Sequence, residues 1–116
     1  MQEAPACVAF VPSTPVTVLY TSPKLQGSIV VFDHRTSSVM HTIDLTQSIC
    51  SLSVRPDGRM IAAGGVNGTV FLVDQQSVSS SELHGHCGPV HASTFGSCGT
   101  YLLTGSRSTM MQWNRM

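Results

Sequence analysis

The chain has 116 residues, of which 41% are hydrophobic and 10% charged, and its six Lys and Arg residues balance six Asp and Glu. It is too apolar for a disordered chain, its cations are too scattered for binding a phosphate backbone, and no apolar run approaches the roughly 20 residues that span a bilayer. The N-terminus lacks the charged and apolar regions of a secretory signal. We therefore expect one small cytoplasmic or otherwise intracellular domain, with the nucleus and the centrosome left open, and neither nucleic acid nor membrane as a partner.

Short segments rich in Val, Ile, Thr, Phe and Tyr follow one another along the chain, which predicts strands. Turn residues separate them, most clearly Pro56-Asp57-Gly58 and Asn67-Gly68, because Gly accepts the positive φ that tight turns need. No segment has the spacing of an amphipathic helix, so the predicted fold class is all-β. In chain order the expected strands lie near 6–12, 17–22, 28–33 and 39–45, then 49–56, 60–66, 69–74 and 78–84, and finally 90–95, 101–106 and 109–114.

The same order of segments recurs three times. The third strands end at Asp33, Asp74 and Asn114, which lie 41 and then 40 positions apart. A fixed period of this length is typical of repeat architectures whose units pack on their neighbours. The whole chain, 1–116, is read as one repeat region with units at about 4–45, 46–86 and 87–116, the last incomplete. Residues at equal offsets should be structurally equivalent, which predicts matching buried positions for Phe10, Val54 and Phe95.

One of these units carries a family signature. His84-Gly85-His86, followed about 27 residues later by Trp113-Asn114, resembles the Gly-His and Trp-Asp signature of WD40 repeats, and the period and the Pro-Asp-Gly turn agree with it. The resemblance implies a partial β-propeller of about two and three-quarter four-stranded antiparallel blades. Propellers close with roughly four to eight blades, so it further implies a fragment of a larger, seven-bladed ring. The missing blades would come from a longer chain or another copy; a self-sufficient small domain is the alternative.

The resemblance also implies a structural network. In the family, the Gly-His histidine, a Ser or Thr on the second strand, an Asp in the following turn and the third-strand Trp form hydrogen bonds with one another. Here these roles fall to His86, to Thr104 or Ser106, and to Trp113, while the Asp is missing from a turn that is about one residue short. The second unit has Val73 at the Trp position. Such degenerate repeats should depend mainly on apolar packing between blades.

Several motifs could indicate chemistry, and the repeat explains each of them. Gly96-Ser97-Cys98-Gly99 lacks the spacing of a nucleophile elbow and falls at a turn, and the sequon Asn67-Gly68-Thr69 falls at a hairpin. The four cysteines contain no Cys-x-x-Cys pair, so we expect reduced thiols. We therefore predict no catalytic residue, no cofactor site and no metal site, although one cluster has metal-ligating side chains: His84, His86, Cys87, His91 and Cys98.

What the resemblance implies about function is binding of proteins or peptides. Partners of such propellers dock on loops that join the second strand to the third, or the fourth to the next first. On that face the candidate contact residues are Lys24, Leu25, Gln47 and Arg107. The leading hypothesis is a non-catalytic scaffold within a larger assembly. The alternatives are a truncated isoform or fragment without independent activity, and membership of a centrosomal or ciliary WD-repeat assembly.

Overall fold

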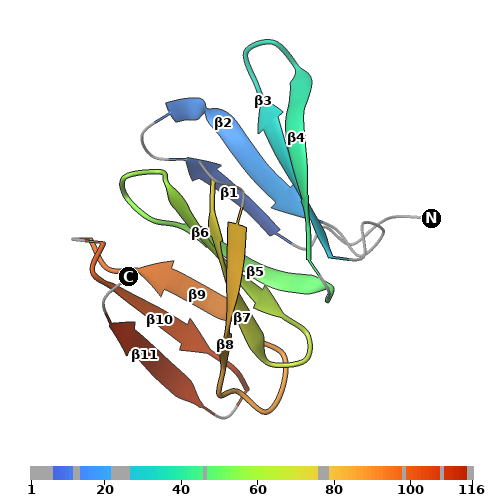
Figure 1. The fold of residues 1–116 in the computed structure, drawn as a ribbon. Helices are drawn as coiled ribbons and strands as arrows, with labels where there is room; N and C mark the ends of the chain where they lie inside the picture. The colour runs from blue at the N-terminus through green and yellow to red at the C-terminus, as the bar shows by residue number, and fades with distance from the viewer. Residues whose placement is uncertain are drawn as a thin grey trace.

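The computed structural model describes residues 7–11, 14–21, 27–45, 47–75, 79–97, 99–107 and 109–114. Within them the chain forms three antiparallel sheets that lie side by side in Figure 1. Blade 1 consists of β1 (Cys7–Val11), β2 (Thr14–Thr21), β3 (Ser28–Asp33) and β4 (Ser38–Asp44). Blade 2 consists of β5 (Ile49–Val54), β6 (Met60–Gly65), β7 (Thr69–Asp74) and β8 (Ser79–His84). Blade 3 consists of β9 (Ala92–Phe95), β10 (Tyr101–Gly105) and β11 (Met110–Asn114).

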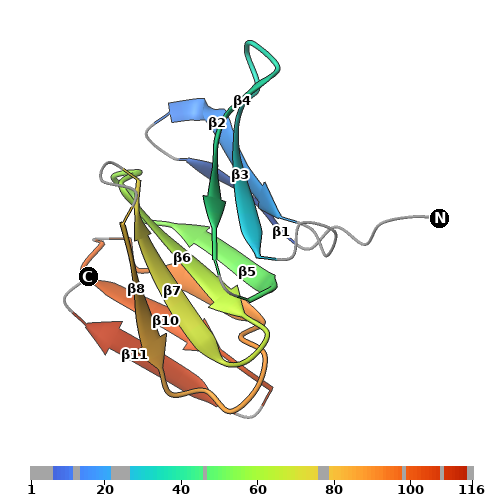
Figure 2. The same cartoon turned by 45° about the vertical axis from the view of Figure 1, so that its right-hand side comes forward.

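Each blade is a meander in which consecutive strands pair. The first strands of the blades contact one another, β1 with β5 and β5 with β9, whereas β4 and β8 form the outer edges. The three sheets are fanned around this inner side, as Figure 2 shows from a second angle. The all-β prediction and the partial propeller are therefore confirmed. In the part of the chain that the structure describes, no helix is long and apolar enough to span a membrane.

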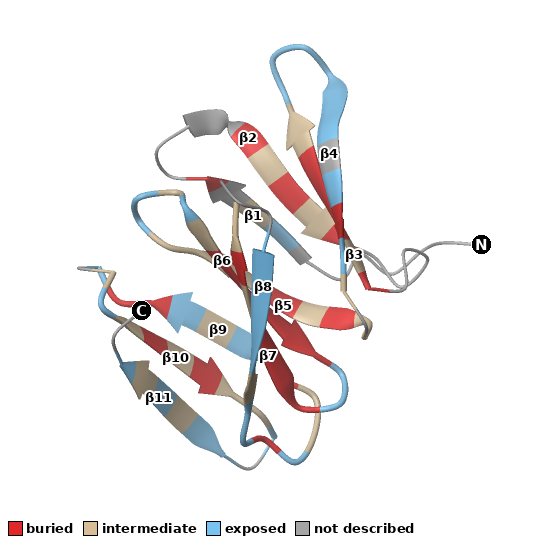
Figure 3. Cartoon of the chain, viewed as in Figure 1, coloured by how far each residue is buried: buried red, intermediate tan, exposed pale blue. Residues whose placement is uncertain are grey.

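The core lies between the blades and not within them. In β6 the consecutive residues Ile61 and Ala62 are both fully buried, although neighbouring side chains of a strand point to opposite faces. Ile61 belongs to the cluster shared with blade 1, and Ala62 to the cluster shared with blade 3. Blade 2 is thus covered on both faces (Figure 3).

The flanking blades are covered on one face only. In blade 1, Leu19 is fully buried against blade 2, while its neighbours Val18 and Tyr20 are half-buried. In blade 3, Leu102 is fully buried and Leu103 half-buried. Burial therefore alternates along β2 and β10 but not along β6, as stacked sheets require.

The predicted equivalence of the first strands holds in the backbone register. Phe10, Val54 and Phe95 pair with Val18, Ile61 and Leu102, one position in each blade. Phe95 is buried, but Val54 is only half-buried, packed against the cluster between blades 1 and 2. The side chain of Phe10 lies outside the described residues.

Candidate functional site

A hydrogen-bonded network ties the loop before blade 3 to that blade. His86, in the loop between β8 and β9, and Thr104, on β10, are both buried. His86 Nε2 lies 2.8 Å from Thr104 Oγ1. Trp113 Nε1, on β11, donates a second hydrogen bond to the same hydroxyl oxygen, also at 2.8 Å. One threonine therefore joins the loop to two strands.

Of the two hydroxyl residues proposed for this network, the structure brings only Thr104 to the histidine. Ser106 Oγ instead contacts the carbonyl oxygen of Thr109 at 3.4 Å, within the turn between β10 and β11. His86 Nδ1 is buried and has no hydrogen-bond partner among the described residues. Among the described residues the network therefore comprises three side chains.

In blade 2, Gln47 makes the corresponding connection. Its side-chain Nε2 donates to Thr69 Oγ1 at 2.8 Å, and its Oε1 accepts the backbone N–H of Asn67 at 2.9 Å. Gln47 thus ties the loop between β4 and β5 to the β6–β7 hairpin, as His86 ties the next loop to blade 3. Gln47 was expected to face a partner, but both polar atoms of its amide bond within the chain. A single Gln in a loop gives no sequence signal for this role.

The β6–β7 hairpin also supports the loop that carries His86. A side chain at Gly68, which has a φ of 94°, would collide with the carbonyl oxygen of His86. Val90 N donates to the carbonyl oxygen of Gly65 at 3.1 Å, and Ser51 Oγ donates to that of Val90 at 3.0 Å. The loop is therefore held by blade 2 before it reaches blade 3.

Of the other predicted contact residues, Arg107 is exposed in the β10–β11 turn. It lies at the same end of the blades as Gln47 and the β6–β7 hairpin. Lys24 and Leu25 lie outside the described residues.

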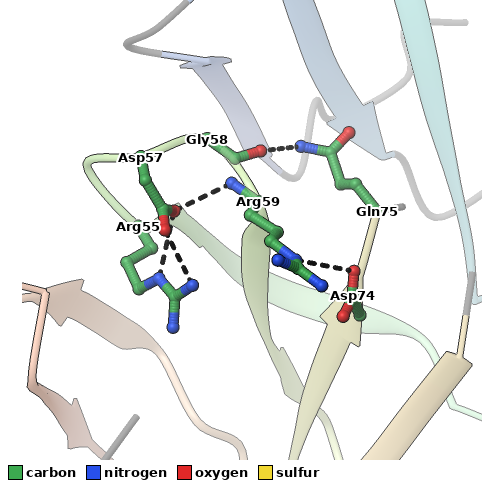
Figure 4. Close-up of polar contacts among 6 residues, drawn as sticks. All are labelled: Arg55, Asp57, Gly58, Arg59, Asp74 and Gln75. Carbon is green, nitrogen blue, oxygen red and sulfur yellow. Dashed lines mark hydrogen bonds and ion pairs between the residues drawn. The ribbon is translucent and has the colours of Figure 1, made fainter. Parts of the chain in front are cut away.

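The opposite end of blade 2 carries a charged cluster (Figure 4). Arg55 donates from two nitrogens to the two carboxylate oxygens of Asp57, at 3.0 and 2.8 Å. This hydrogen bond lowers the pKa of the Asp57 carboxyl and raises the pKa of Arg55. Beside it, Arg59 pairs with Asp74 at 3.6 Å, and Gln75 Nε2 donates to the carbonyl oxygen of Gly58. The cluster fastens the β5–β6 turn to the end of β7.

The cluster borders a hollow between the turns of blades 2 and 3. The hollow is about 300 Å³ and is lined by Arg55, Pro56, Asp57 and Gly99. A Cβ at Gly99 would lie 3.3 Å from the Arg55 Cγ, so the arginine stem fits against the glycine. From the sequence, Pro56-Asp57-Gly58 was expected only to form a turn. The basic residues on either side of it, at 55 and 59, were the signal for a charged surface.

The described members of the metal-like cluster, His84, His86, Cys87 and His91, do not come together as a metal site. No group of three metal-ligating side chains lies close enough for an ion in the ranges that the structure describes. His84 and Cys87 are exposed, and His84 Nε2 lies 3.3 Å from Glu82. His91 lines a hollow of about 410 Å³ beside the inner strands together with Cys50, whose thiol pKa is raised by burial. Cys50 and Cys87 are free thiols, while the side chains of Cys7 and Cys98 lie outside the described residues.

The family described as "WD domain, G-beta repeat" matches residues 34–74 and 77–114. The chain belongs to the WD40-repeat family. Each match includes an outer strand and the first three strands of the next blade, β4 to β7 and then β8 to β11. The unit boundaries expected above, which begin at a first strand, divide the same repeat differently and stay a prediction.

Two curated relatives cover most of this WD40-repeat chain. Centriole proteome protein 16 of Chlamydomonas reinhardtii is 37% identical over 95 residues, which are 82% of the chain and 5% of that protein. WD repeat-containing protein 90 of Homo sapiens is 25% identical over 109 residues, 94% of the chain and 6% of that protein. The chain therefore spans about one twentieth of the length of these relatives.

Solved structures share the fold at low identity. A structure of U3-55K has a TM-score of 0.86 and 18% identity, over 98% of this chain and 37% of that one. The RRP9 WD40 repeats have a TM-score of 0.85 and 19% identity, over 98% and 36%. Kuenenia stuttgartiensis hydrazine synthase has a TM-score of 0.86 and 16% identity, over 95% and 32%. Since one of these proteins is named as an enzyme, the fold alone does not decide between binding and catalysis.

Proposed function

We propose that this chain is a non-catalytic, protein-binding part of a WD-repeat scaffold in a centriolar or ciliary assembly. The observation that carries the proposal is the 37% identity to a centriole proteome protein, in a chain that belongs to the WD40-repeat family. WD-repeat proteins typically bind other proteins. Identity at this level over 82% of the chain supports a role in the same kind of assembly.

The use of the polar side chains supports binding over catalysis. The groups best suited to chemistry, His86 and Thr104, are buried and bonded to one another. Catalysis needs such groups to converge on a space that a substrate can enter. The turns at both ends of the blades instead present exposed residues such as Arg107 and Asp57, which suit contact with a partner.

The uncovered faces of blades 1 and 3 support a place within a larger propeller. Tyr20 and Phe32 are half-buried on blade 1, with ring centroids 6.5 Å apart, and Met110 is 72% exposed on blade 3. Met110 and Leu103 line a shallow apolar hollow of about 280 Å³. Further blades would cover both faces and complete a ring, seven-bladed as the family resemblance implies. A truncated isoform would leave them exposed and prone to association.

The experiment that tests the function is proximity labelling in ciliated cells with the chain fused to a biotin ligase. Wild-type chain should enrich centriolar or ciliary proteins over the ligase alone. The control variant is Ile61→Asp, which places a charge in the core between blades 1 and 2 and should abolish the enrichment. Equal labelling by the wild type and this variant would contradict a folded scaffold. Enrichment of proteins from another structure would contradict the centriolar assignment.

Size-exclusion chromatography with light scattering tests the alternative of a fragment without independent activity. A discrete monomer with β-rich circular dichroism supports a competent binding unit. Soluble aggregates would favour the truncated form, whose uncovered faces associate.

A further inference from the structure

The outer strand of blade 1 exposes two large apolar side chains next to one another. Val39 and Met40, both on β4, are each 54% exposed. Outer strands of a stacked sheet face solvent and normally carry polar side chains. This pair therefore calls for a specific explanation.

A β-bulge places the two side chains. Val31 pairs with His41, and Phe32 pairs with Val39, so Met40 is an extra residue in β4. A bulge bends the strand and re-aims side chains. It thus sets Val39 and Met40 together opposite Phe32, which is itself half-buried.

The strand β8 shows whether an outer strand becomes buried when its blade is covered on both faces. Ser80 pairs with Val73 as Val39 pairs with Phe32, so Ser80 is the blade 2 equivalent of Val39. Blade 2 is covered on both faces, yet residues 79 to 82 are all exposed. A further blade packed on blade 1 would therefore leave β4 exposed as well. Closure of the propeller does not explain why Val39 stands where blade 2 has Ser80, or why the extra residue of β4 is an exposed Met.

A cation lies at the end of this apolar surface. Arg35 is exposed in the turn between β3 and β4, at the tip of a hairpin that stands away from the other blades in Figures 1 and 3. The carboxylate of Asp33 accepts the backbone N–H groups of Arg35 and Thr36, at 2.9 and 3.4 Å, so it caps the turn. The hairpin thus presents an apolar pair followed by a positive charge.

We propose that the Val39–Met40 surface of β4 is a docking site for an amphipathic helix of a protein partner, with an acidic side chain of that helix facing Arg35. A helix presents apolar side chains in a stripe and can place an acidic residue one or two turns away. An added partner strand fits poorly, because the extra residue at Met40 breaks the regular alternation of backbone donors and acceptors along the edge. The inference rests on the proposed protein-binding function and gives it a location and a partner chemistry.

The test measures fluorescence anisotropy of a labelled peptide titrated with the full 116-residue chain. The probe is a synthetic helical peptide of about 18 residues, long enough to form a helix, with Leu along one face and Glu near one end. Val39→Ser and Met40→Ser introduce the residue type of β8. Each should weaken binding about fivefold, since each removes roughly half the burial of one apolar side chain. Met110→Ser, on the uncovered face of blade 3, is the matched control and should leave affinity unchanged.

Charge reversal tests the orientation of the helix. Arg35→Glu should weaken binding of the Glu peptide and strengthen binding of a matched peptide that carries Lys in place of Glu. Circular dichroism of every variant separates loss of binding from loss of folding, and Met40→Gln is a second substitution if Met40→Ser is unstable. The proposal is overturned if the helical Glu peptide does not bind the folded chain, or if an extended peptide of equal composition binds as well. It is also overturned if Met110→Ser weakens binding while Val39→Ser and Met40→Ser do not. Such a result, with centriolar labelling intact, would leave the proposed function standing.

Discussion

Trp113 faces Leu102 across the β10–β11 pair, yet its indole Nε1 donates to the hydroxyl of Thr104, two residues further along β10, at 2.8 Å. This diagonal contact places the ring over the strand that also receives His86. Trp113 packs against the cluster shared by blades 2 and 3. The same side chain therefore contributes to the third sheet and to the interface between sheets.

Replacing the shared hydroxyl should weaken blade 3. Thr104→Val keeps the shape of the side chain but leaves Trp113 Nε1 and His86 Nε2 without their partner, which should cost about 1–3 kcal/mol of unfolding free energy. Urea unfolding can be followed by the fluorescence of Trp113, the sole Trp in the sequence. Thr94→Val, at an exposed position on β9, is the control and should have almost no effect. Equal stability of the two variants would mean that the hydroxyl contributes little.

Because blade 3 stacks on blade 2 with one face only, truncating two neighbouring side chains of β10 should lower the stability by different amounts. Leu102 is fully buried in the interface, so Leu102→Ala should lower the unfolding free energy by about 2–5 kcal/mol. Leu103 points to the other face and lines the shallow hollow with Met110, so Leu103→Ala should cost about 1 kcal/mol. Chemical denaturation of both variants measures the difference. A larger loss at Leu103 would reverse the assignment of the faces.

The arrangement of strands could be predicted from the sequence because the signals for strands and for turns are both local. Val, Ile and Thr mark the strands, and Pro56-Asp57-Gly58 and Asn67-Gly68 mark turns at which the structure has hairpins. The contacts of His86 and Trp113 could be anticipated through the family resemblance, but the choice of Thr104 over Ser106 needed the register of β10.

Other features depend on contacts that no local pattern records. Gln47 bonds to Thr69, 22 positions away, and neither residue type indicates the pairing. Arg59 meets Asp74 only because β6 and β7 are hydrogen-bonded neighbours. The exposure of Val39 and Met40 was likewise hidden, since Val and Met inside a predicted strand are ordinarily core residues.

Gln47 should be a structural residue of blade 2. Gln47→Ala removes hydrogen bonds to Thr69 and to the Asn67 amide, and should cost about 1–2 kcal/mol. Hydrogen exchange should become faster at the Asn67 amide. Gln112→Ala, at an exposed site where the amide contacts only the neighbouring Asn114 among the described residues, should change neither quantity. Unchanged exchange at Asn67 in Gln47→Ala would contradict the bridging role.

The Arg55–Asp57 pair predicts a small loss of stability in acid. The pKa of Asp57 is lowered in the folded state by its hydrogen bond to Arg55, so the folded chain favours the ionised carboxyl. The stabilisation is fully present above the unfolded carboxyl's pKa of about 4, and it is lost as the pH falls through the lower folded value. Because the Asp57 side chain is 53% exposed, solvent and salt should keep the effect small.

Comparison with Asp57→Asn isolates this contribution. The difference in unfolding free energy between wild type and variant should be constant above about pH 5, shrink below about pH 4, and diminish in 1 M NaCl. A difference that grows in acid would mean that the folded pKa is raised, and would contradict the contact with Arg55.

The two described cysteines should differ in reactivity. The thiolate is the form that alkylating reagents attack, and burial raises the pKa of Cys50, so less of it is ionised at pH 8. Cys87 is exposed in the loop between β8 and β9. Iodoacetamide should therefore modify Cys87 about tenfold faster than Cys50, as measured by mass spectrometry of peptides taken over a time course. In urea the two rates should converge, because unfolding removes the burial of Cys50. Equal rates in the native chain would show that the inner strands leave Cys50 as accessible as the loop.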